Sequence, residues 1–285
     1  MSLADRPSLG ISLRIVSGFL MAGMYVSVKL VSEEIPLGEI VFFRSFFALI
    51  PLILFLWLRN EFPNGLATKR PIDHLLRSGL GTLAMFAAFA TLAYLSVAEA
   101  ILIAQLSPML MAIAAVIFLS ERLTLWRVLG ILLGFSGVLV LVWPELDNDT
   151  LDRSRLIGIG LGLIAAVLAA FAMIMIRSLN RTESPGAIAL YFVIASMTAA
   201  LVTIPWGWVM PQGNMLWFLI SAGLFGGFAH IAMTLSFRYA EASRLAPFEY
   251  LAFLWPLLAD LLIFKLPLAA SFLLAAPLVL SLIHI

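Results

Sequence analysis

Long apolar runs fill most of the 285-residue chain, and they constrain its fold more than any other feature of the sequence. Hydrophobic residues make up 63% of the positions and charged residues only 12%, about half the charged share of a soluble domain. A helix needs about 20 mostly apolar residues to cross the hydrocarbon core of a bilayer. Because the runs are continuously apolar rather than alternating, they predict transmembrane helices and not the strands of a membrane barrel.

Ten segments have the length and composition expected of such helices. They are residues 12–31, 38–58, 75–95, 99–119, 126–143, 156–176, 185–206, 215–237, 245–264 and 268–283. The first run is too long for a removable signal peptide, and further runs follow it at once. The sequence therefore predicts an all-α integral membrane protein that crosses the bilayer ten times.

Positive charges are distributed unevenly along the chain. If the N-terminus lies in the cytoplasm, most of the 17 lysines and arginines fall on the cytoplasmic side, and Arg44 lies within a predicted span. Amphipathic tryptophan rings favour the headgroup level, and most tryptophans lie near predicted helix ends. These are Trp57, Trp126, Trp143, Trp206, Trp208 and Trp217.

The acidic segment 144–152 divides the chain nearly in half. Moving the second half back by 142 positions aligns Gly81 with Gly223 and the Ala-Glu-Ala block Ala98–Ala100 with Ala240–Ala242. Since five helices per half is an odd number, the second half must enter the membrane in the opposite sense. We therefore predict two inverted repeats, residues 1–147 and 148–285. Inverted repeats recur in secondary transporters, whose halves rock about a site near the bilayer midplane.

Several other functions lack their minimum parts in this chain. There is no cysteine, and three scattered histidines do not form a cluster, so we expect no metal site. A net charge of +1 without a basic block gives no support for nucleic-acid binding. No phosphate-binding loop, metalloprotease motif or nucleophile elbow is present. We therefore expect neither an enzyme nor an ATP-driven pump, and no cofactor.

The stretch from Leu92 to Leu141, which begins LAYLSVAEAILIAQLSPML, resembles the EamA domain of the drug/metabolite transporter superfamily. The resemblance extends to FFRSFFALIPLI (Phe42–Ile53) and FRYAEASRLAPFEYLAFLW (Phe237–Trp255). It implies ten helices as two inverted five-helix repeats around a central cavity, in a bacterial inner membrane, with both termini cytoplasmic. One departure stands out, because the second half has Lys265 where the family usually repeats the acidic residue that Glu121 supplies in the first half.

The finer resemblance is to bacterial YddG-type exporters of amino acids, aromatic ones included. It implies that a small molecule, most simply an amino acid, leaves the cytoplasm by alternating access. The segment Arg238–Tyr250 also looks like family members that move riboflavin or S-adenosylmethionine. A nontransporting membrane scaffold or receptor is the alternative from another class. The lipid bilayer is the second expected partner, and both a monomer and a homodimer fit the sequence.

Polar groups within the predicted spans are the candidates for a substrate site in the central cavity. A charge at the bilayer centre costs ~2.5–3.5 kcal/mol on insertion scales, so it should face protein or water. Arg44 could capture a substrate carboxylate, or pair with Glu39 or a helix C-terminus. Glu249 could bind a substrate ammonium group or carry a proton, or it could lie at the membrane interface. His230 could titrate during transport, or stay neutral inside the bundle.

Uncharged residues complete the set of candidates. Gln105 offers amide donors and acceptors to a cavity. Four aromatic residues could form a wall of the cavity or simply pack: Tyr25, Tyr94, Tyr250 and Trp255. Three prolines in the fourth and ninth predicted spans could free carbonyl groups for solute or permit bending, or give static kinks: Pro108, Pro247 and Pro256.

Overall fold

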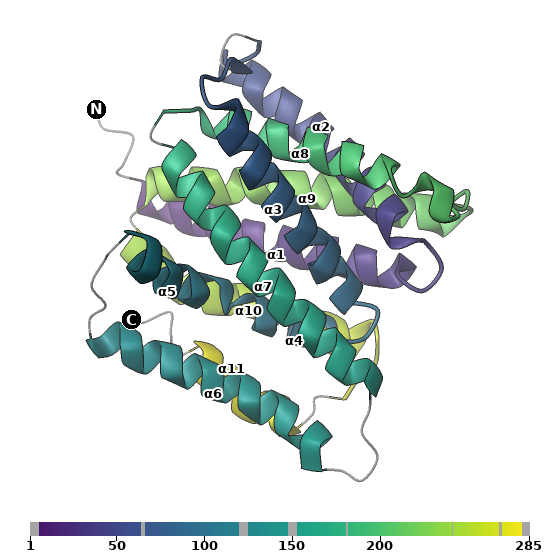
Figure 1. Ribbon diagram of the computed structural model, residues 1–285, viewed down its shortest axis with the longest axis vertical. Helices are drawn as coiled ribbons and strands as arrows, with labels where there is room; N and C mark the ends of the chain where they lie inside the picture. Colours follow the sequence, from purple (N-terminus) through teal and green to yellow (C-terminus); the bar gives the residue numbers. More distant parts are fainter. Residues whose placement is uncertain are drawn as a thin grey trace.

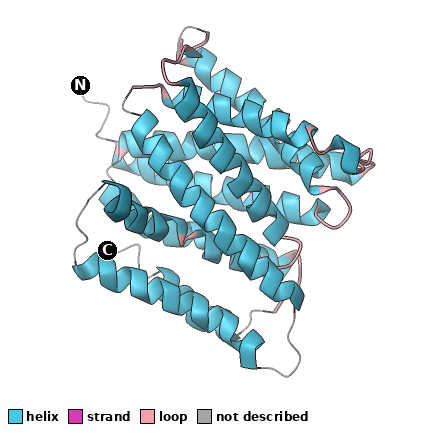
Figure 2. Ribbon diagram, viewed as in Figure 1, coloured by secondary structure: helices cyan, strands magenta, loops and turns pink. Residues whose placement is uncertain are grey.

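The computed structural model describes residues 6–63, 66–119, 125–147, 153–180, 182–240, 242–267 and 270–280. Throughout these residues the chain forms helices and turns, without a strand (Figures 1 and 2). The helices are α1 (Pro7–Val31), α2 (Leu37–Leu58), α3 (Pro71–Thr91), α4 (Val97–Ala104), α5 (Ser107–Leu119), α6 (Leu125–Asp147), α7 (Arg153–Leu179), α8 (Pro185–Leu201), the short 3-10 helix η2 (Ile204–Trp206), α9 (Asn214–Tyr239), α10 (Ala242–Leu262) and α11 (Ala270–Leu280). The all-α prediction is confirmed.

The helices lie over the ranges that the apolar runs predict. Within the described residues, four helices are long and apolar enough to cross a membrane, judged by length and composition. They are Pro7–Val31, Leu37–Leu58, Arg153–Ile176 and Asn214–Ser236. The number of ten spans stays a prediction.

The outer surface of the bundle is rich in large apolar side chains. Leu75 is 71% exposed and Trp206 is 77% exposed, and many leucines, isoleucines and phenylalanines on the helices are likewise exposed. A water-soluble monomer rarely shows so much apolar surface, whereas a lipid-facing one needs it. Trp57, in the last turn of α2, and Trp217, in the first turn of α9, are also exposed, as expected of interfacial rings.

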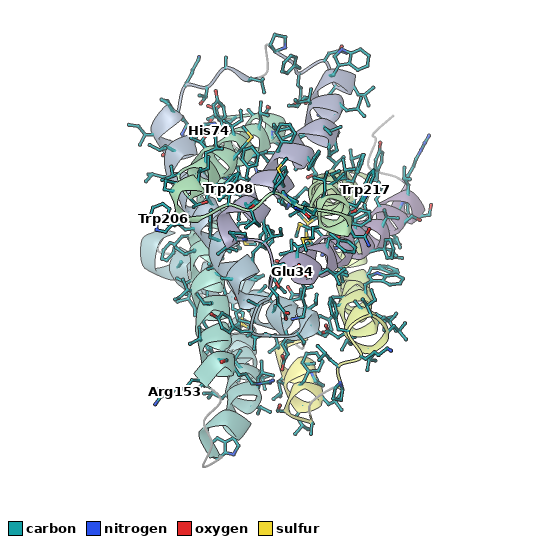
Figure 3. All side chains as sticks on the ribbon, turned by 90° about the vertical axis from the view of Figure 1, so that its right-hand side faces the viewer. Glu34, His74, Arg153, Trp206, Trp208 and Trp217 are labelled. Atoms are coloured by element: carbon teal, nitrogen blue, oxygen red, sulfur yellow. The ribbon has the colours of Figure 1, made fainter. Side chains whose placement is uncertain are left out.

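Turns gather at two opposite ends of the bundle (Figure 2). We name these ends after α1, as the Pro7 end and the Val31 end. Figure 3 looks onto the Val31 end, where Trp206 and Trp217 lie on opposite sides of the molecule. The turn between α1 and α2, which carries Glu34, also belongs to this end.

Two large apolar clusters fill the interior, beside a smaller one between α2 and α8 that includes Leu56 and Leu190. One lies among α1, α2, α3, α4, α8 and α9, and includes Val28, Ile40 and Leu219. The other lies among α4, α5, α6, α7, α10 and α11, and includes Leu102 and Phe272. Helix α6 pairs with α11 at one edge of the molecule, whereas α2 and α8 lie at the opposite edge (Figure 1). Helix α4 contributes to both clusters and joins the two parts of the core.

The fourth predicted span is broken into two helices. Helix α4 begins with a capping box, in which the Ser96 hydroxyl accepts from the Glu99 amide and the Glu99 carboxylate accepts from the Ser96 amide. It ends at Ala104, and α5 begins three residues later at Ser107, with Pro108 in its first turn, where the missing N–H costs nothing. Helix α10, by contrast, continues through Pro256.

Helix α9 crosses α2 at close range because three glycines lie at the contact. A Cβ atom on Gly223 would lie 2.9 Å from the Arg44 carbonyl oxygen and 3.1 Å from the Ala48 amide nitrogen. A Cβ on Gly227 would lie 3.2 Å from the Ala48 carbonyl oxygen, and one on Gly226 would lie 3.2 Å from Arg44 Nη2. The contact therefore brings the two backbones together and leaves space for the Arg44 guanidinium group.

Candidate substrate cavity

A cavity of about 140 Å³ lies between α2, α3, α8 and α9. We call it the arginine cavity. Its polar side chains are those of Arg44, Arg77, His230 and Thr234, and the remaining described lining residues are apolar residues, glycines and a proline. Phe55 and Pro185 line it near the Pro7 end, where α2 ends and α8 begins.

Arg44 lies on α2 and is only 3% exposed. Its Nε atom is buried and makes no hydrogen bond within the described part of the chain. Glu39, the partner that the sequence offered as a structural explanation, instead accepts a hydrogen bond from the Val209 amide at 3.0 Å. Among the described residues, therefore, Glu39 does not pair with the Arg44 guanidinium group, and the Nε atom of that group has an unfilled hydrogen bond.

Arg77 approaches the same cavity from α3. Its Cζ atom lies 4.1 Å from the centroid of the Phe192 ring, so the ring covers one face of the guanidinium group. Its Nε and Nη1 atoms are buried without a hydrogen bond among the described residues. The ring contacts the face of the guanidinium group and does not accept hydrogen bonds from the N–H groups in its plane. These N–H groups can donate to a planar anionic group such as a carboxylate.

His230, from α9, lies beside both arginines, whose positive charges act on it and on each other. One turn further on, the Thr234 hydroxyl donates to the His230 carbonyl oxygen at 2.8 Å. No aspartate or glutamate is among the described residues that line the cavity. The arrangement is therefore a cationic site with mainly apolar walls, able to hold an anionic solute away from water.

The structure places other candidate residues elsewhere. Tyr25 packs edge-on against Phe89 at a centroid distance of 6.2 Å, and it is not among the described residues that line the arginine cavity. Gln105 and Pro256 line a separate cavity of about 170 Å³ between α1, α4, α9 and α10. Of the candidates, the structure thus brings Arg44 and His230 to one cavity and keeps Gln105 apart from them.

The remaining aromatic candidates do not share one wall. Tyr94 lies in the turn between α3 and α4 and lines a third cavity, at the Val31 end. Trp255 makes an edge-on contact with Phe19 at 5.3 Å and lines an open apolar groove between α1, α9 and α10. The side chains of three further candidates lie outside the described residues: Pro247, Glu249 and Tyr250.

Arg77 is the functional candidate that the sequence reasoning missed. It falls within the predicted span 75–95, near its start. The rule that a charge inside a span needs a protein or water partner would have selected it alongside Arg44. No sequence signal could show that the two arginines, on different helices, line one cavity.

A set of charged side chains joins helices at the opposite, Val31 end. We call Lys29, Glu99, Arg155 and Asp260 the polar clasp. Lys29 Nζ donates to the carbonyl oxygens of Leu92 and Leu95, at 2.9 and 2.8 Å. The Asp260 carboxylate accepts from the first amides of α4, those of Val97 and Ala98, at 3.1 and 2.7 Å. Arg155 donates to the Glu99 carboxylate. The clasp ties α1, α7 and α10 to the turn between α3 and α4.

Helices with an apolar outer surface around an internal cationic cavity define a multi-pass membrane protein with a site for a small solute. Residues 8–143 match the model of the EamA-like transporter family. The pseudopaline exporter CntI of Pseudomonas aeruginosa is 30% identical over 85% of this chain and 83% of its own length. The chain therefore belongs to the EamA-like transporter family, and it is a transporter of small metabolites and not an enzyme. The family resemblance drawn from the sequence is confirmed.

Other relatives carry different substrates in their names. The S-adenosylmethionine uptake transporter of Rickettsia felis is 27% identical over 84% of this chain and 79% of its own length. The riboflavin transporter of Vibrio cholerae is 25% identical over 93% and 88%, respectively. A solved crystal structure with 18% sequence identity superposes with a TM-score of 0.67 over 96% of each chain, which shows a shared fold alone.

Proposed function

We propose that the protein carries small carboxylate-bearing metabolites, amino acids among them, out of the cytoplasm by alternating access. The observation that carries this proposal is the arginine cavity, where Arg44 and Arg77 present unsatisfied donors inside the bundle. A buried guanidinium group is stabilised when an anion supplies its hydrogen bonds and its counter-charge. A carboxylate is the anionic group common to all amino acids.

The pattern of helix contacts supports two inverted repeats, 1–147 and 148–285. Exchanging the halves maps α1 onto α7, α2 onto α8, α3 onto α9, the broken pair α4–α5 onto α10, and α6 onto α11. Under this exchange the contact of α1 with α9 becomes that of α7 with α3, and the contact of α2 with α9 becomes that of α8 with α3. The contact of α1 with α10 likewise becomes that of α7 with α5. Counted with α4 and α5 as one, the proposed spans number ten.

The two ends of the bundle support alternating access. The arginine cavity reaches the Pro7 end, at Phe55 and Pro185, whereas the polar clasp joins helices at the Val31 end. Transporters of inverted-repeat design expose a midplane site to one side at a time. In this proposal the structure represents a state with the Val31 end closed.

The distribution of positive charge supports the orientation. Arg59, Lys69 and Arg70 belong to the connection between α2 and α3, at the Pro7 end. Positive residues in short loops favour the cytoplasmic side. We therefore place the Pro7 end and both termini in the cytoplasm and the protein in a bacterial inner membrane, as a monomer or a homodimer.

The choice among substrates rests on chemistry and on relatives. The resemblance to YddG-type exporters favours amino acids, and relatives named for riboflavin and S-adenosylmethionine provide the competing candidates. A scaffold that binds no solute would not need a cavity lined by two arginines whose buried nitrogen atoms have no described partner.

Uptake into proteoliposomes tests the proposal. We expect radiolabelled threonine or phenylalanine to accumulate inside vesicles that contain the protein and not inside empty ones. Unlabelled riboflavin and S-adenosylmethionine serve as competitors. Arg44→Ala should lower uptake about tenfold or more, because it removes a charge-assisted hydrogen bond of about 1.5–3 kcal/mol. Gln105→Ala, in the separate cavity, is expected to have a smaller effect.

A protein that folds but moves none of these compounds would contradict the proposal and favour the scaffold. If Arg44→Ala and Gln105→Ala reduced uptake equally, the arginine cavity would not be the substrate site. The proposal that the protein transports small metabolites would still stand.

A further inference from the structure

Among its described lining residues, the arginine cavity has positive side chains and no carboxylate. Arginine keeps its positive charge in proteins, so Arg44 and Arg77 place two cations in one buried site. The two charges repel each other across a mainly apolar space. Buried charges are normally paired, and a site with two uncompensated cations favours an occupant with two negative charges.

The nearby described carboxylates are already engaged elsewhere. Glu39 accepts from the Val209 amide, and Glu61 accepts from Arg59 Nε at 2.7 Å. Glu183 accepts from the Lys69 amide at 3.4 Å and lies 3.7 Å from His74 Nε2. None of these carboxylates lines the arginine cavity. The described part of the chain therefore offers no internal counter-ion to either guanidinium group.

The surroundings leave room beside the Arg44 guanidinium group and support that of Arg77. Gly226 leaves room beside the Arg44 guanidinium, since a Cβ atom there would lie 3.2 Å from Nη2 and 3.3 Å from Nε. Phe192 supports the Arg77 guanidinium from one face. A held, planar guanidinium group binds a carboxylate or phosphate through two parallel hydrogen bonds, which a lysine cannot reproduce.

We propose that Arg44 and Arg77 together bind a small metabolite with two negative charges, one charge for each guanidinium group. This inference rests on the proposed function and narrows its substrate class to dianions. The cavity of about 140 Å³ exceeds the roughly 10–15 Å³ that a single bound water needs, so it has room for a small solute. The ammonium group of a neutral amino acid, by contrast, finds no carboxylate among the described lining residues.

Binding measurements on the purified full-length protein test the inference independently of transport. Isothermal titration calorimetry at pH 7 compares succinate with butyrate, which has the same number of carbons and one carboxylate fewer, and with phenylalanine. We expect succinate to bind roughly tenfold more tightly than butyrate, as one additional charge-assisted contact implies. Inorganic phosphate is a further ligand in this comparison. Tight binding of phosphate would indicate that the natural ligand carries both negative charges on one group. Weak binding of phosphate would indicate that the ligand carries them on two separate carboxylates.

Substitutions assign the effect to the two arginines. Arg44→Gln and Arg77→Gln should each reduce the preference for succinate over butyrate to about one, since either variant leaves a single cation. Arg44→Lys retains the charge without the planar fork and should keep part of the preference, which separates a binding defect from a folding defect. Arg153→Gln is the matched control, because Arg153 is an exposed arginine at the start of α7, outside the cavity (Figure 3).

Equal affinities for succinate and butyrate in the unchanged protein would overturn the inference, as would a preference that survives both glutamine variants. Transport of phenylalanine without a preference for dianions would contradict the inference and leave the proposed function standing. Tight succinate binding without transport of any solute would support the inference and contradict the proposed function.

Discussion

Buried charges at the two ends of this molecule differ in what they contact. Lys29 and Asp260 each bind two backbone groups, whereas Arg44 and Arg77 have buried nitrogen atoms without a described partner. A charge whose hydrogen bonds are filled by its own chain stabilises the fold. A charge whose donors stay unfilled costs stability until a ligand fills them.

Asp260 gives the clearest stability prediction. Its carboxylate is 1% exposed and accepts from the Val97 and Ala98 amides, which have no partner within α4. We expect Asp260→Ala to lower the free energy of unfolding by about 2–4 kcal/mol, and Asp260→Asn, which keeps one acceptor oxygen, by roughly half as much. Unfolding by sodium dodecyl sulfate in mixed micelles, followed by circular dichroism, measures both.

A surface carboxylate serves as the control for Asp260. Asp73 pairs with Arg70 at 2.7 Å, but its side chain is 35% exposed. Exposed ion pairs contribute about 1 kcal/mol or less, so Asp73→Ala should have a small effect. An effect of Asp73→Ala as large as that of Asp260→Ala would show that burial does not determine the contribution of either carboxylate.

At the residue scale the sequence predicted part of the site. Arg44 and His230 are candidates because polar groups within a span should face protein or water and not lipid. Both line the arginine cavity. Gln105 was selected by the same logic but lines another cavity, because its helix faces α1 and α10. The face that a residue presents depends on packing between helices, and a uniformly apolar helix has no periodicity that reveals it.

Among the helices, the contact of α2 with α9 is set by small residues rather than by side-chain interlocking. Gly223, Gly226 and Gly227 bring the α9 backbone onto α2 next to Arg44. The geometry of the cavity therefore depends on the absence of three Cβ atoms as much as on the side chains present.

Alanine substitutions on these glycines should separate packing from helix propensity. A Cβ atom on Gly223 would approach two backbone atoms of α2 within 3.1 Å, and backbone cannot move aside without shifting the helix. We expect Gly223→Ala to destabilise the protein by about 1–3 kcal/mol, as overpacking does. The melting temperature in detergent measures the change.

Gly160 on α7 is the matched control, since a Cβ atom there meets nothing within 4 Å. Gly160→Ala should be neutral or stabilising by up to about 1 kcal/mol, because alanine favours the helix. If both alanine variants changed the melting temperature equally, the close approach of α2 and α9 would not matter for stability.

The positions of the helices could be predicted from the sequence better than their continuity. Every apolar run predicted as a span carries a helix, because apolar length alone determines this in a membrane setting. The break between α4 and α5 near Pro108, and the unbroken course of α10 through Pro256, were not foreseen. Proline removes a donor in both, so the different outcomes come from the surrounding packing, which the sequence does not display.

For the whole molecule, the inverted repeat stays a prediction, drawn from an offset of 142 positions that aligns a few residues. The interhelical contacts follow the same exchange of halves, and they involve residues that the alignment did not use. The sequence could not predict which helices of one half pack on which helices of the other, because a continuously apolar surface accepts many partners.

Single cysteines test the topology without background labelling, since the chain has no cysteine. Four exposed positions cover both ends in each half: Glu34, Lys69, Thr182 and Gln212. We expect a membrane-impermeant maleimide to label cysteines at positions 34 and 212 in intact cells. Cysteines at positions 69 and 182 should react only in inside-out vesicles, because the positive charges favour a cytoplasmic Pro7 end.

Labelling of positions 69 and 182 in intact cells would reverse the proposed orientation. If positions 34 and 212, or positions 69 and 182, were labelled from opposite sides of the membrane, the inverted repeat would be wrong.

Opening the Val31 end would separate four backbone hydrogen bonds held by Lys29 and Asp260. Hydrogen bonds to charged groups are worth about 1.5–3 kcal/mol each, so the closed arrangement is strongly favoured until water replaces them. A ligand shifts such an equilibrium only by the difference between its affinities for the two states. In the proposed alternating-access cycle, the energy that opens this end would therefore come from the difference in solute or ion affinity between the two states.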